Sequence, residues 1–193
     1  LISHRSYLDE WALPPSLVGF GIAPPFGFAG ANLDFFPLGT VARRTGIVHI
    51  RRSTSGAPVY KLALRAFMRQ LIATRANLIW SIEGGRSRTG KLRPPRFGLL
   101  RYVVDAVEQL DGHDALLVPV SIVYDQLPTR EADLMTSEAR GQGKRPEDVR
   151  WFLDYVRGLR HRRGRIYVDF GEPLALRARL AELAQDATAD GEA

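Results

Sequence analysis

The sequence contains no cysteine. This absence excludes disulfide bonds, zinc–thiolate sites, iron–sulfur clusters and a cysteine nucleophile, although it assigns no compartment. The sequence also lacks a charged N-terminal region followed by an apolar stretch, so no signal peptide is visible. Because the chain opens at Leu1 rather than at a methionine, we expect it to be a piece of a longer protein, cut at its front.

Long uninterrupted apolar runs are absent as well. The most apolar stretch, residues 17–39, carries one charge, at Asp34. Prolines at positions 14, 15, 24, 25 and 37 lie in it or just before it, and it holds five glycines. These residues argue against a continuous membrane-spanning helix. We expect a compact, partly buried loop region there instead.

What remains is the composition of an ordinary soluble globular protein, with 45% hydrophobic and 25% charged residues. A length of 193 residues is enough for one sizeable core and predicts a single domain over residues 1–193. Lysine and arginine number 27 against 21 acidic residues, a formal net charge of +6. This excess favours negatively charged partners: nucleic acid, phosphorylated small molecules or an anionic membrane surface.

Short apolar runs alternate with segments of helical periodicity, which is the pattern of an α/β domain. The predicted strands are 47–50, 78–82, 115–124 and 166–170, and the predicted helices open at Pro58, Gly98, Pro146 and Leu174. In the helix that opens at Pro58, the apolar face predicted from the spacing comprises Val59, Leu62, Ala63, Ala66 and Phe67. Pro119 interrupts the third strand, which indicates an edge position or a bulge. Residues 126–145 are predicted to form a loop, and 146–187 a closing helix–strand–helix.

His4 and Asp9 are the first candidate catalytic residues. In an unbroken helix, five steps of about 100° would place them about 140° apart. Ser6 and Asp9 have the spacing of a capping box, however, and with Ser6 as N-cap His4 would precede the helix. Asp9 could then accept a hydrogen bond from one ring nitrogen and leave the other free to take a proton. From this segment alone, a surface histidine beside a capping aspartate is the simpler interpretation.

Two basic segments are candidate phosphate sites. Arg51 and Arg52 follow the predicted strand 47–50, where α/β folds place ligands, and paired guanidinium groups suit a phosphate monoester. Residues 83–90 follow the next strand, and their glycines allow close backbone approach to a ligand. Within 83–90, Glu83 is expected to be held by an arginine or to bind a substrate hydroxyl. His49 lies inside the apolar run and is predicted to be a packed strand residue.

Four motifs then carry a resemblance that no one of them would carry alone. They are His-x4-Asp at residues 4–9, Gly-x-x-x-Ile-Arg-Arg at 46–52, Glu-Gly-Gly-Arg-Ser-Arg at 83–88, and a Val-Pro strand ending in Tyr-Asp at 118–125. In this order they resemble the motifs of the glycerolipid acyltransferases, specifically the bacterial glycerol-3-phosphate acyltransferases. His49 stands where that family usually has phenylalanine. The resemblance covers residues 1–125 and implies a mixed β-sheet flanked by helices.

The resemblance also implies roles for individual residues. By matching position, His4 is the general base that deprotonates the acceptor hydroxyl, and Asp9 orients it. The residues implied to bind the phosphate and glycerol of the acceptor are Arg51, Arg52, Glu83, Gly84, Arg86, Ser87 and Arg88. Pro119 is implied in binding of the acyl donor. No metal or other cofactor is implied, because the thioester of acyl-CoA or acyl-carrier protein is already activated.

The implied reaction is transfer of a fatty acyl group to glycerol 3-phosphate, giving lysophosphatidate, by a peripheral protein on the cytoplasmic face of the membrane. Dihydroxyacetone phosphate and lysophosphatidate remain alternative acceptors, although the third motif favours glycerol 3-phosphate. A basic cluster is a hypothetical docking site for anionic headgroups: Arg157, Arg160, His161, Arg162, Arg163 and Arg165. The rival interpretations are a nucleic-acid-binding module, suggested by the charge, and an inactive acyltransferase domain that retains lipid binding.

Overall fold

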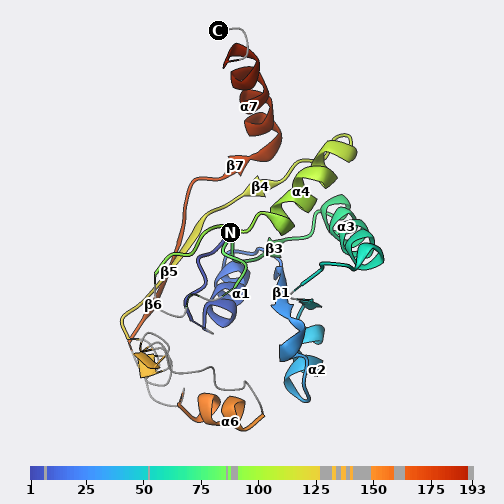
Figure 1. Cartoon of the computed structure of the whole chain (residues 1–193). Helices are drawn as coiled ribbons and strands as arrows, with labels where there is room; N and C mark the ends of the chain where they lie inside the picture. Colours follow the sequence, from blue (N-terminus) through green and yellow to red (C-terminus); the bar gives the residue numbers. More distant parts are fainter. Residues whose placement is uncertain are drawn as a thin grey trace. The chain divides into compact units, whose positions relative to one another are not determined.

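The computed structural model describes residues 1–6, 8–51, 53–85, 87, 91–126, 132–133, 136–137, 140, 149–158 and 164–190. Helices and strands alternate along the chain, so the predicted α/β class is confirmed (Figure 1). The elements are α1 (Asp9–Gly19), β1 (Phe26–Gly30), the 3-10 helix η1 (Ala31–Leu33), α2 (Leu38–Arg44), β2 (Ile47–Ile50), α3 (Pro58–Ala73), β3 (Leu78–Ile79), α4 (Gly98–Gln109), β4 (Leu116–Leu117), β5 (Val120–Tyr124), α6 (Val149–Gly158), β6 (Ile166–Phe170), β7 (Leu174–Ala175) and α7 (Leu176–Asp190).

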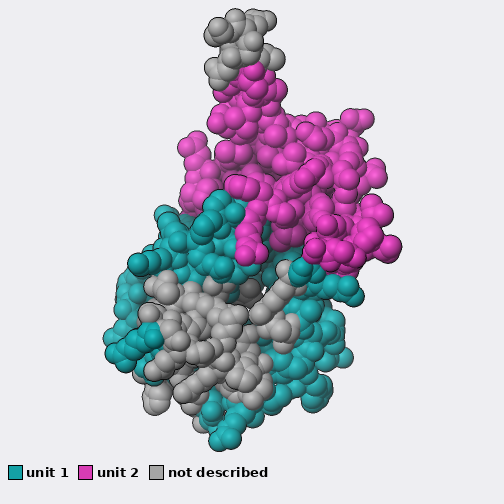
Figure 2. Space-filling view, in the orientation of Figure 1, with its two compact units in different colours: residues 1–53, 77–95, 120–169 teal, residues 54–76, 96–119, 170–193 magenta. Residues whose placement is uncertain are grey.

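The chain divides into two compact units, coloured separately in Figure 2, and each is assembled from three stretches of sequence. Unit 1 comprises Leu1–Ser53, Asn77–Pro95 and Val120–Asp169. Unit 2 comprises Thr54–Ala76, Arg96–Pro119 and Phe170–Ala193. The expectation of one domain over 1–193 stays a prediction. Among the described residues, no helix is both long and apolar enough to cross a bilayer.

Unit 1 is built around a parallel three-stranded sheet in the order β2-β1-β3. Gly27 of the central strand β1 lies opposite Ile47 on one side and Ile79 on the other. A Cβ atom at position 27 would lie 2.7 Å from Cδ1 of Ile47, so a larger residue there would require the end of the Ile47 side chain to move. Parallel strands require crossover connections, and the helical segments between the strands supply them.

The N-terminal residues extend this arrangement. Ile2 forms parallel bridges to Ser81, just beyond β3, and to Val120 at the start of β5. Strand β5 pairs in turn with β6. Ile2 also belongs to the core of the unit with Leu13 and Ile79, against which Leu17, Val120, Ile122 and Val168 pack. The first residues of the chain are therefore held in place by backbone pairing and by apolar burial together.

Unit 2 holds α3, α4 and α7 and the short antiparallel pair β4–β7. Helix α3 packs on α4, and Met68 and Val107 are fully buried there. Arg177 donates hydrogen bonds from its side chain to the carbonyl oxygens of Val107, Leu110 and His113, which ties the start of α7 to the end of α4. Arg177 is exposed, so these bonds are made at the surface of the unit.

Several predicted elements are confirmed. The strands at 47–50 and 166–170 have the predicted bounds, and helices begin at Pro58 and Gly98 as expected. The predicted strand 115–124 is interrupted at Pro119 and forms two strands, β4 and β5. A helix at 149–158 lies in the segment where a helix was predicted to open at Pro146. The predicted loop at 126–145 lies largely outside the described residues.

The loop predicted for residues 17–39 is wrong. This region contains the end of α1, strand β1, η1 and the start of α2, and β1 is the central strand of its sheet. Its sequence, Phe-Gly-Phe-Ala-Gly, has weak strand propensity because two of its five residues are glycine. The strand forms because its small residues allow two neighbouring strands to approach it. Its own sequence does not predict this pairing.

The face predicted to be buried on α3 is also wrong. Val59 and Leu62 are 77% and 66% exposed, whereas the buried residues are Leu64, Met68, Leu71 and Ile72. Both sets recur at helical spacing, because more than one side of this helix is apolar. Packing against α4 selects the second set, and the first remains on the surface.

Candidate active site

The candidate site begins with the segment that precedes α1. Ile2 donates its N–H to the carbonyl oxygen of Trp80 at 3.2 Å, and the N–H of Val120 donates to the carbonyl oxygen of Leu1 at 2.8 Å. These bonds hold the extended chain between the end of β3 and the start of β5. His4 follows two residues later, so its position is set by the sheet and not only by the helix that comes after it.

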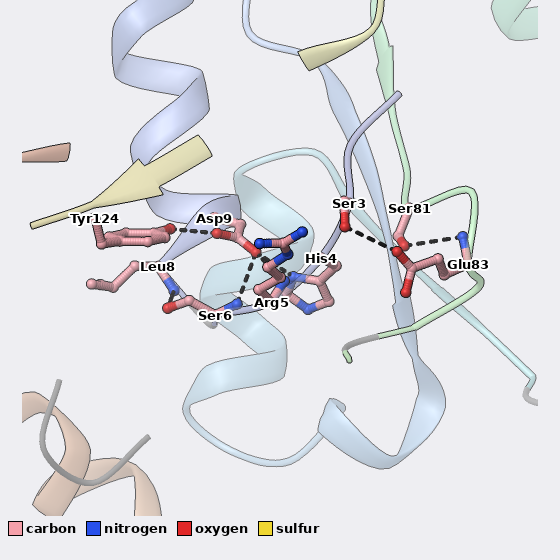
Figure 3. A network of polar contacts seen from close by, with 9 residues as sticks. All are labelled: Ser3, His4, Arg5, Ser6, Leu8, Asp9, Ser81, Glu83 and Tyr124. Atoms are coloured by element: carbon pink, nitrogen blue, oxygen red, sulfur yellow. Dashed lines mark hydrogen bonds and ion pairs between the residues drawn. The ribbon is translucent and has the colours of Figure 1, made fainter. Parts of the chain in front are cut away.

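His4 and Asp9 form a hydrogen-bonded pair (Figure 3). Nδ1 of the His4 ring lies 3.0 Å from Oδ2 of Asp9, and α1 begins at Asp9, so His4 precedes the helix as predicted. The His4 side chain is 13% exposed and that of Asp9 is 1% exposed. Because a carboxylate can only accept, Nδ1 carries the proton, which leaves Nε2 as the basic nitrogen. No partner for Nε2 is found within the part of the chain that the structure describes.

The predicted capping box forms only in half. The Asp9 carboxylate accepts a hydrogen bond from the backbone N–H of Ser6 at 2.9 Å, which is the return half of the box. Oγ of Ser6, however, accepts from the backbone N–H of Leu8 at 3.0 Å, and Leu8, not Ser6, occupies the N-cap position. The reason is that Asp9 itself starts the helix, so its carboxylate folds back over the preceding turn. There it also accepts from the backbone N–H of Arg5 at 2.7 Å.

Tyr124, at the end of β5, donates its hydroxyl hydrogen to Oδ1 of Asp9 (Figure 3). Burial alone would raise the pKa of the Asp9 carboxyl, but the hydrogen bonds from His4, Tyr124 and the Ser6 backbone outweigh it and lower that pKa. Asp9 is therefore held as a carboxylate. Sequence analysis assigned no role to Tyr124, although it closes the fourth motif; only the pairing of distant segments brings it to Asp9.

Glu83 lies in the same unit, after β3, and is 2% exposed. Its Oε1 accepts from Oγ–H of Ser3 at 2.9 Å, and its Oε2 accepts from the backbone N–H of Arg93 at 3.2 Å. The carboxylate thus connects the start of the chain to the loop of the third motif (Figure 3). Ser3 was missed by sequence analysis, because nothing in its neighbourhood marks it as the partner of a residue eighty positions away.

The loop of the third motif turns back toward His4. Gly84 and Gly85 have φ values of +68° and +154°, which favour glycine and give the tight turn that the sequence predicts. Beyond them, the backbone N–H of Ser87 donates to the carbonyl oxygen of His4 at 2.7 Å. Ser87 is 1% exposed, and its hydroxyl donates to the carbonyl oxygen of Lys91. The first and third motifs are therefore in direct contact.

Comparison with known proteins decides what kind of protein carries this arrangement. Residues 1–123 match the acyltransferase family, and residues 135–193 match the glycerol-3-phosphate acyltransferase C-terminal region. The chain belongs to the acyltransferase family. Its resemblance to glycerolipid acyltransferases of the glycerol-3-phosphate type is thereby confirmed.

Two relatives of this acyltransferase come from mycobacteria. Proteins named "Putative acyltransferase plsB1" from Mycobacterium bovis and Mycobacterium tuberculosis are each 54% identical to it over 189 residues. The match covers 98% of this chain but only 30% of each relative. The chain therefore spans about a third of the length of the curated relatives it matches.

The remaining predicted site residues of this acyltransferase are placed as follows. Arg51 is exposed and comes directly after β2, at the carboxyl end of the parallel sheet, as predicted. Arg52, Arg86 and Arg88 lie outside the described residues. Pro119 belongs to unit 2, where its carbonyl oxygen accepts from the N–H of Gly171 at 2.8 Å. The structure thus brings together His4, Asp9, Glu83, Gly84 and Ser87.

His49 behaves as the sequence predicts. It lies within β2, in register with Ala29 of β1, and both its ring nitrogens are buried. Neither nitrogen has a hydrogen-bond partner among the described residues. The His49 ring therefore fills the space of an aromatic side chain in the strand. It takes no part in the pair formed by His4 and Asp9.

Proposed function

We propose that this acyltransferase moves a fatty acyl group from acyl-CoA or acyl-carrier protein to a hydroxyl of glycerol 3-phosphate, giving lysophosphatidate. The observation that carries the proposal is the His4–Asp9 pair, with Nδ1 bound at 3.0 Å and Nε2 left to accept a proton. The match of residues 135–193 to the glycerol-3-phosphate acyltransferase C-terminal region supports this choice of acceptor.

In the proposed step, Nε2 of His4 takes the proton of the acceptor hydroxyl as that oxygen attacks the thioester carbonyl carbon. A C–O bond forms, the C–S bond breaks, and the thiolate leaves with the proton that His4 gives back. Asp9 stabilises the imidazolium formed in between. The chain contains no cysteine, so no thiol of its own can carry the acyl group, which agrees with direct transfer between two bound substrates.

The acceptor phosphate is proposed to bind to Arg51, Arg52, Arg86 and Arg88. Guanidinium groups bind phosphate through two parallel hydrogen bonds, which fixes orientation as well as affinity. Glu83, Gly84 and Ser87 are proposed to contribute through the loop that carries them. The bonds of Glu83 to Ser3 and of Ser87 to the carbonyl oxygen of His4 hold this loop close to the imidazole. Pro119 is proposed to contact the acyl donor, and the reaction needs no metal or other cofactor.

The product is a lipid, so we further propose that the protein docks peripherally on the cytoplasmic face of the cell membrane. The support for this is the net charge of +6 and the basic cluster, of which Arg157 and Arg165 are described and exposed. Anionic headgroups attract basic residues near the surface by about 1 kcal/mol each.

The proposal is tested by incubating the chain with labelled glycerol 3-phosphate and palmitoyl-CoA and following lysophosphatidate. Dihydroxyacetone phosphate and lysophosphatidate are tested in parallel as acceptors. His4→Ala is expected to lower the rate by roughly 10²–10⁴-fold, because general-base catalysis usually accelerates a reaction by that factor. His113→Ala, a histidine outside the four motifs and outside the basic cluster, is the control and should retain the rate. Equal activity of His4→Ala and its parent, or transfer only to another acceptor, contradicts the proposal.

A further inference from the structure

The Asp9 carboxylate is the most heavily bonded side chain of the described site. Its Oδ2 accepts from the His4 ring and from the backbone N–H groups of Arg5 and Ser6, at 3.0, 2.7 and 2.9 Å. Its Oδ1 accepts from the hydroxyl of Tyr124 (Figure 3). With only 1% of the side chain exposed, water cannot replace a missing donor.

These four donors differ in origin. Three of them come from residues 4–6, the same short segment that carries the imidazole. Tyr124 comes from β5, 115 positions away in the sequence. It is the donor that connects the carboxylate to a different element of unit 1. Rotation about the Cβ–Cγ bond moves both carboxylate oxygens together, so the bond from Tyr124 to Oδ1 opposes this rotation from a second element, in addition to the three bonds to Oδ2.

Tyr124 is itself held firmly. Strand β5 pairs with β6, and the next residue, Asp125, is bound twice to Arg165. The N–H of Asp125 donates to the carbonyl oxygen of Arg165 at 3.1 Å, and the N–H of Arg165 donates to Oδ2 of Asp125 at 2.9 Å. A donor fixed by its own strand can impose an orientation, which a mobile side chain cannot do.

We propose that Tyr124 is a positioning residue, whose hydroxyl fixes the plane of the Asp9 carboxylate and thereby keeps Oδ2 on Nδ1 of His4. This role rests on the proposed function, since the pair must hold Nε2 toward the acceptor hydroxyl during acyl transfer. It also agrees with the pKa of Asp9, which burial would raise and which the bond from His4 and then the bond from Tyr124 lower. Partners of this kind orient a reacting group without touching the substrate.

The experiment compares Tyr124→Phe, which removes the hydroxyl and keeps the ring, with Tyr167→Phe on the neighbouring strand β6. Tyr167 is 50% exposed and serves as the matched control. The structural readout is the low-field proton resonance of the Nδ1–H bond to Asp9, assigned by its loss in His4→Ala. The kinetic readout is kcat and KM for glycerol 3-phosphate. Tyr124→Phe is expected to shift or broaden the resonance and to lower kcat about tenfold with KM unchanged.

An unchanged resonance in Tyr124→Phe overturns the proposal, whether or not kcat falls. If the parent chain transfers no acyl group, the proposed function fails, but the resonance still decides whether Tyr124 positions the pair. Should Tyr124→Phe not fold, 3-fluorotyrosine incorporated at position 124 replaces it. Its more acidic hydroxyl keeps the shape and strengthens the bond to Asp9, so the same resonance must move. No movement again overturns the proposal, and an equal effect in Tyr167→Phe does so too.

Discussion

The buried polar side chains of unit 1 lie in the candidate active site. Among the described residues, the polar side chains that are almost fully buried are Ser6, Asp9, Glu83 and Ser87, and each belongs to the first or the third motif. Removing such groups from water costs free energy unless hydrogen bonds replace the lost hydration. Each of the four has such bonds. The motifs therefore mark a rigid polar network as well as reactive groups.

Asp9 should make stability depend on acid pH. Its pKa is lowered in the folded state, so the unfolded chain binds more protons and stability rises with pH in that range. The contribution is complete above the unfolded value of about 3.9 and is lost as the pH falls through the lower folded pKa. We expect Asp9→Asn to lower the free energy of unfolding at pH 7 by roughly 1–3 kcal/mol, and the difference to shrink in acid.

Urea unfolding at a series of pH values from neutral to acid measures this difference. Asp169→Asn, on an exposed position of β6, is the matched control and should follow the parent throughout. A difference between Asp9→Asn and parent that stays constant down to the most acidic pH would show that the Asp9 carboxylate is not stabilised by folding.

Ser3 should matter for stability although it has no reactive role. Ser3→Ala removes the donor to Oε1 of Glu83, a bond of 2.9 Å to a buried carboxylate, so we expect a loss of about 1.5–3 kcal/mol. The control is Ser16→Ala in α1, whose hydroxyl donates to a carbonyl oxygen of its own helix and should change stability by less than about 0.5 kcal/mol. Equal unfolding midpoints for the two variants in urea would contradict the role of Ser3.

At the scale of elements, α3 shows what hydrophobic periodicity predicts and what it does not. The helix and its start follow from the sequence, because Pro58 suits the first turn and the apolar residues recur at helical spacing. The buried side does not, because apolar residues lie on two sides. In strand β1 the secondary structure itself was not predicted. Its sequence has weak strand propensity, and pairing with its neighbours β2 and β3 stabilises the strand.

Two substitutions within α3 test which side is buried. Met68 is fully buried, so Met68→Ala should cost about 2–5 kcal/mol through lost burial and the cavity that remains. Leu62 is 66% exposed, so Leu62→Ala should change stability by less than about 0.5 kcal/mol. Chemical denaturation of both variants provides the measurement. A larger loss of stability for Leu62→Ala than for Met68→Ala would show that the face predicted from spacing is the buried one.

At the scale of the molecule, each unit is made from three separate stretches of sequence. The described site residues His4, Asp9, Glu83, Ser87 and Tyr124 all belong to unit 1 and come from all three of its stretches. Strand pairing and the bridges of Ile2 to Ser81 and Val120 bring these distant segments together. Binding to a charged surface, in contrast, depends on exposed basic residues and not on this internal arrangement.

The charge predicts binding to anionic vesicles. With the basic cluster at 157–165 changed to glutamine, we expect at least a tenfold loss of binding, because several contributions of about 1 kcal/mol are removed. The matched control changes five exposed arginines outside the cluster to glutamine: Arg44, Arg69, Arg75, Arg96 and Arg101. Sedimentation with anionic and zwitterionic vesicles measures the difference. An equal loss for both variants would show that binding follows net charge alone.

The sequence by itself determined the α/β class, the order of the four motifs and the fact that His4 precedes the first helix. These are local properties: apolar period, turn residues and spacing along the chain. Only the tertiary structure decided which side of α3 is buried, that a glycine-rich segment is a central strand, and that Ser3 and Tyr124 bond to Glu83 and Asp9. Contacts between residues some eighty to over a hundred positions apart leave no periodic trace, because they depend on which strands become neighbours.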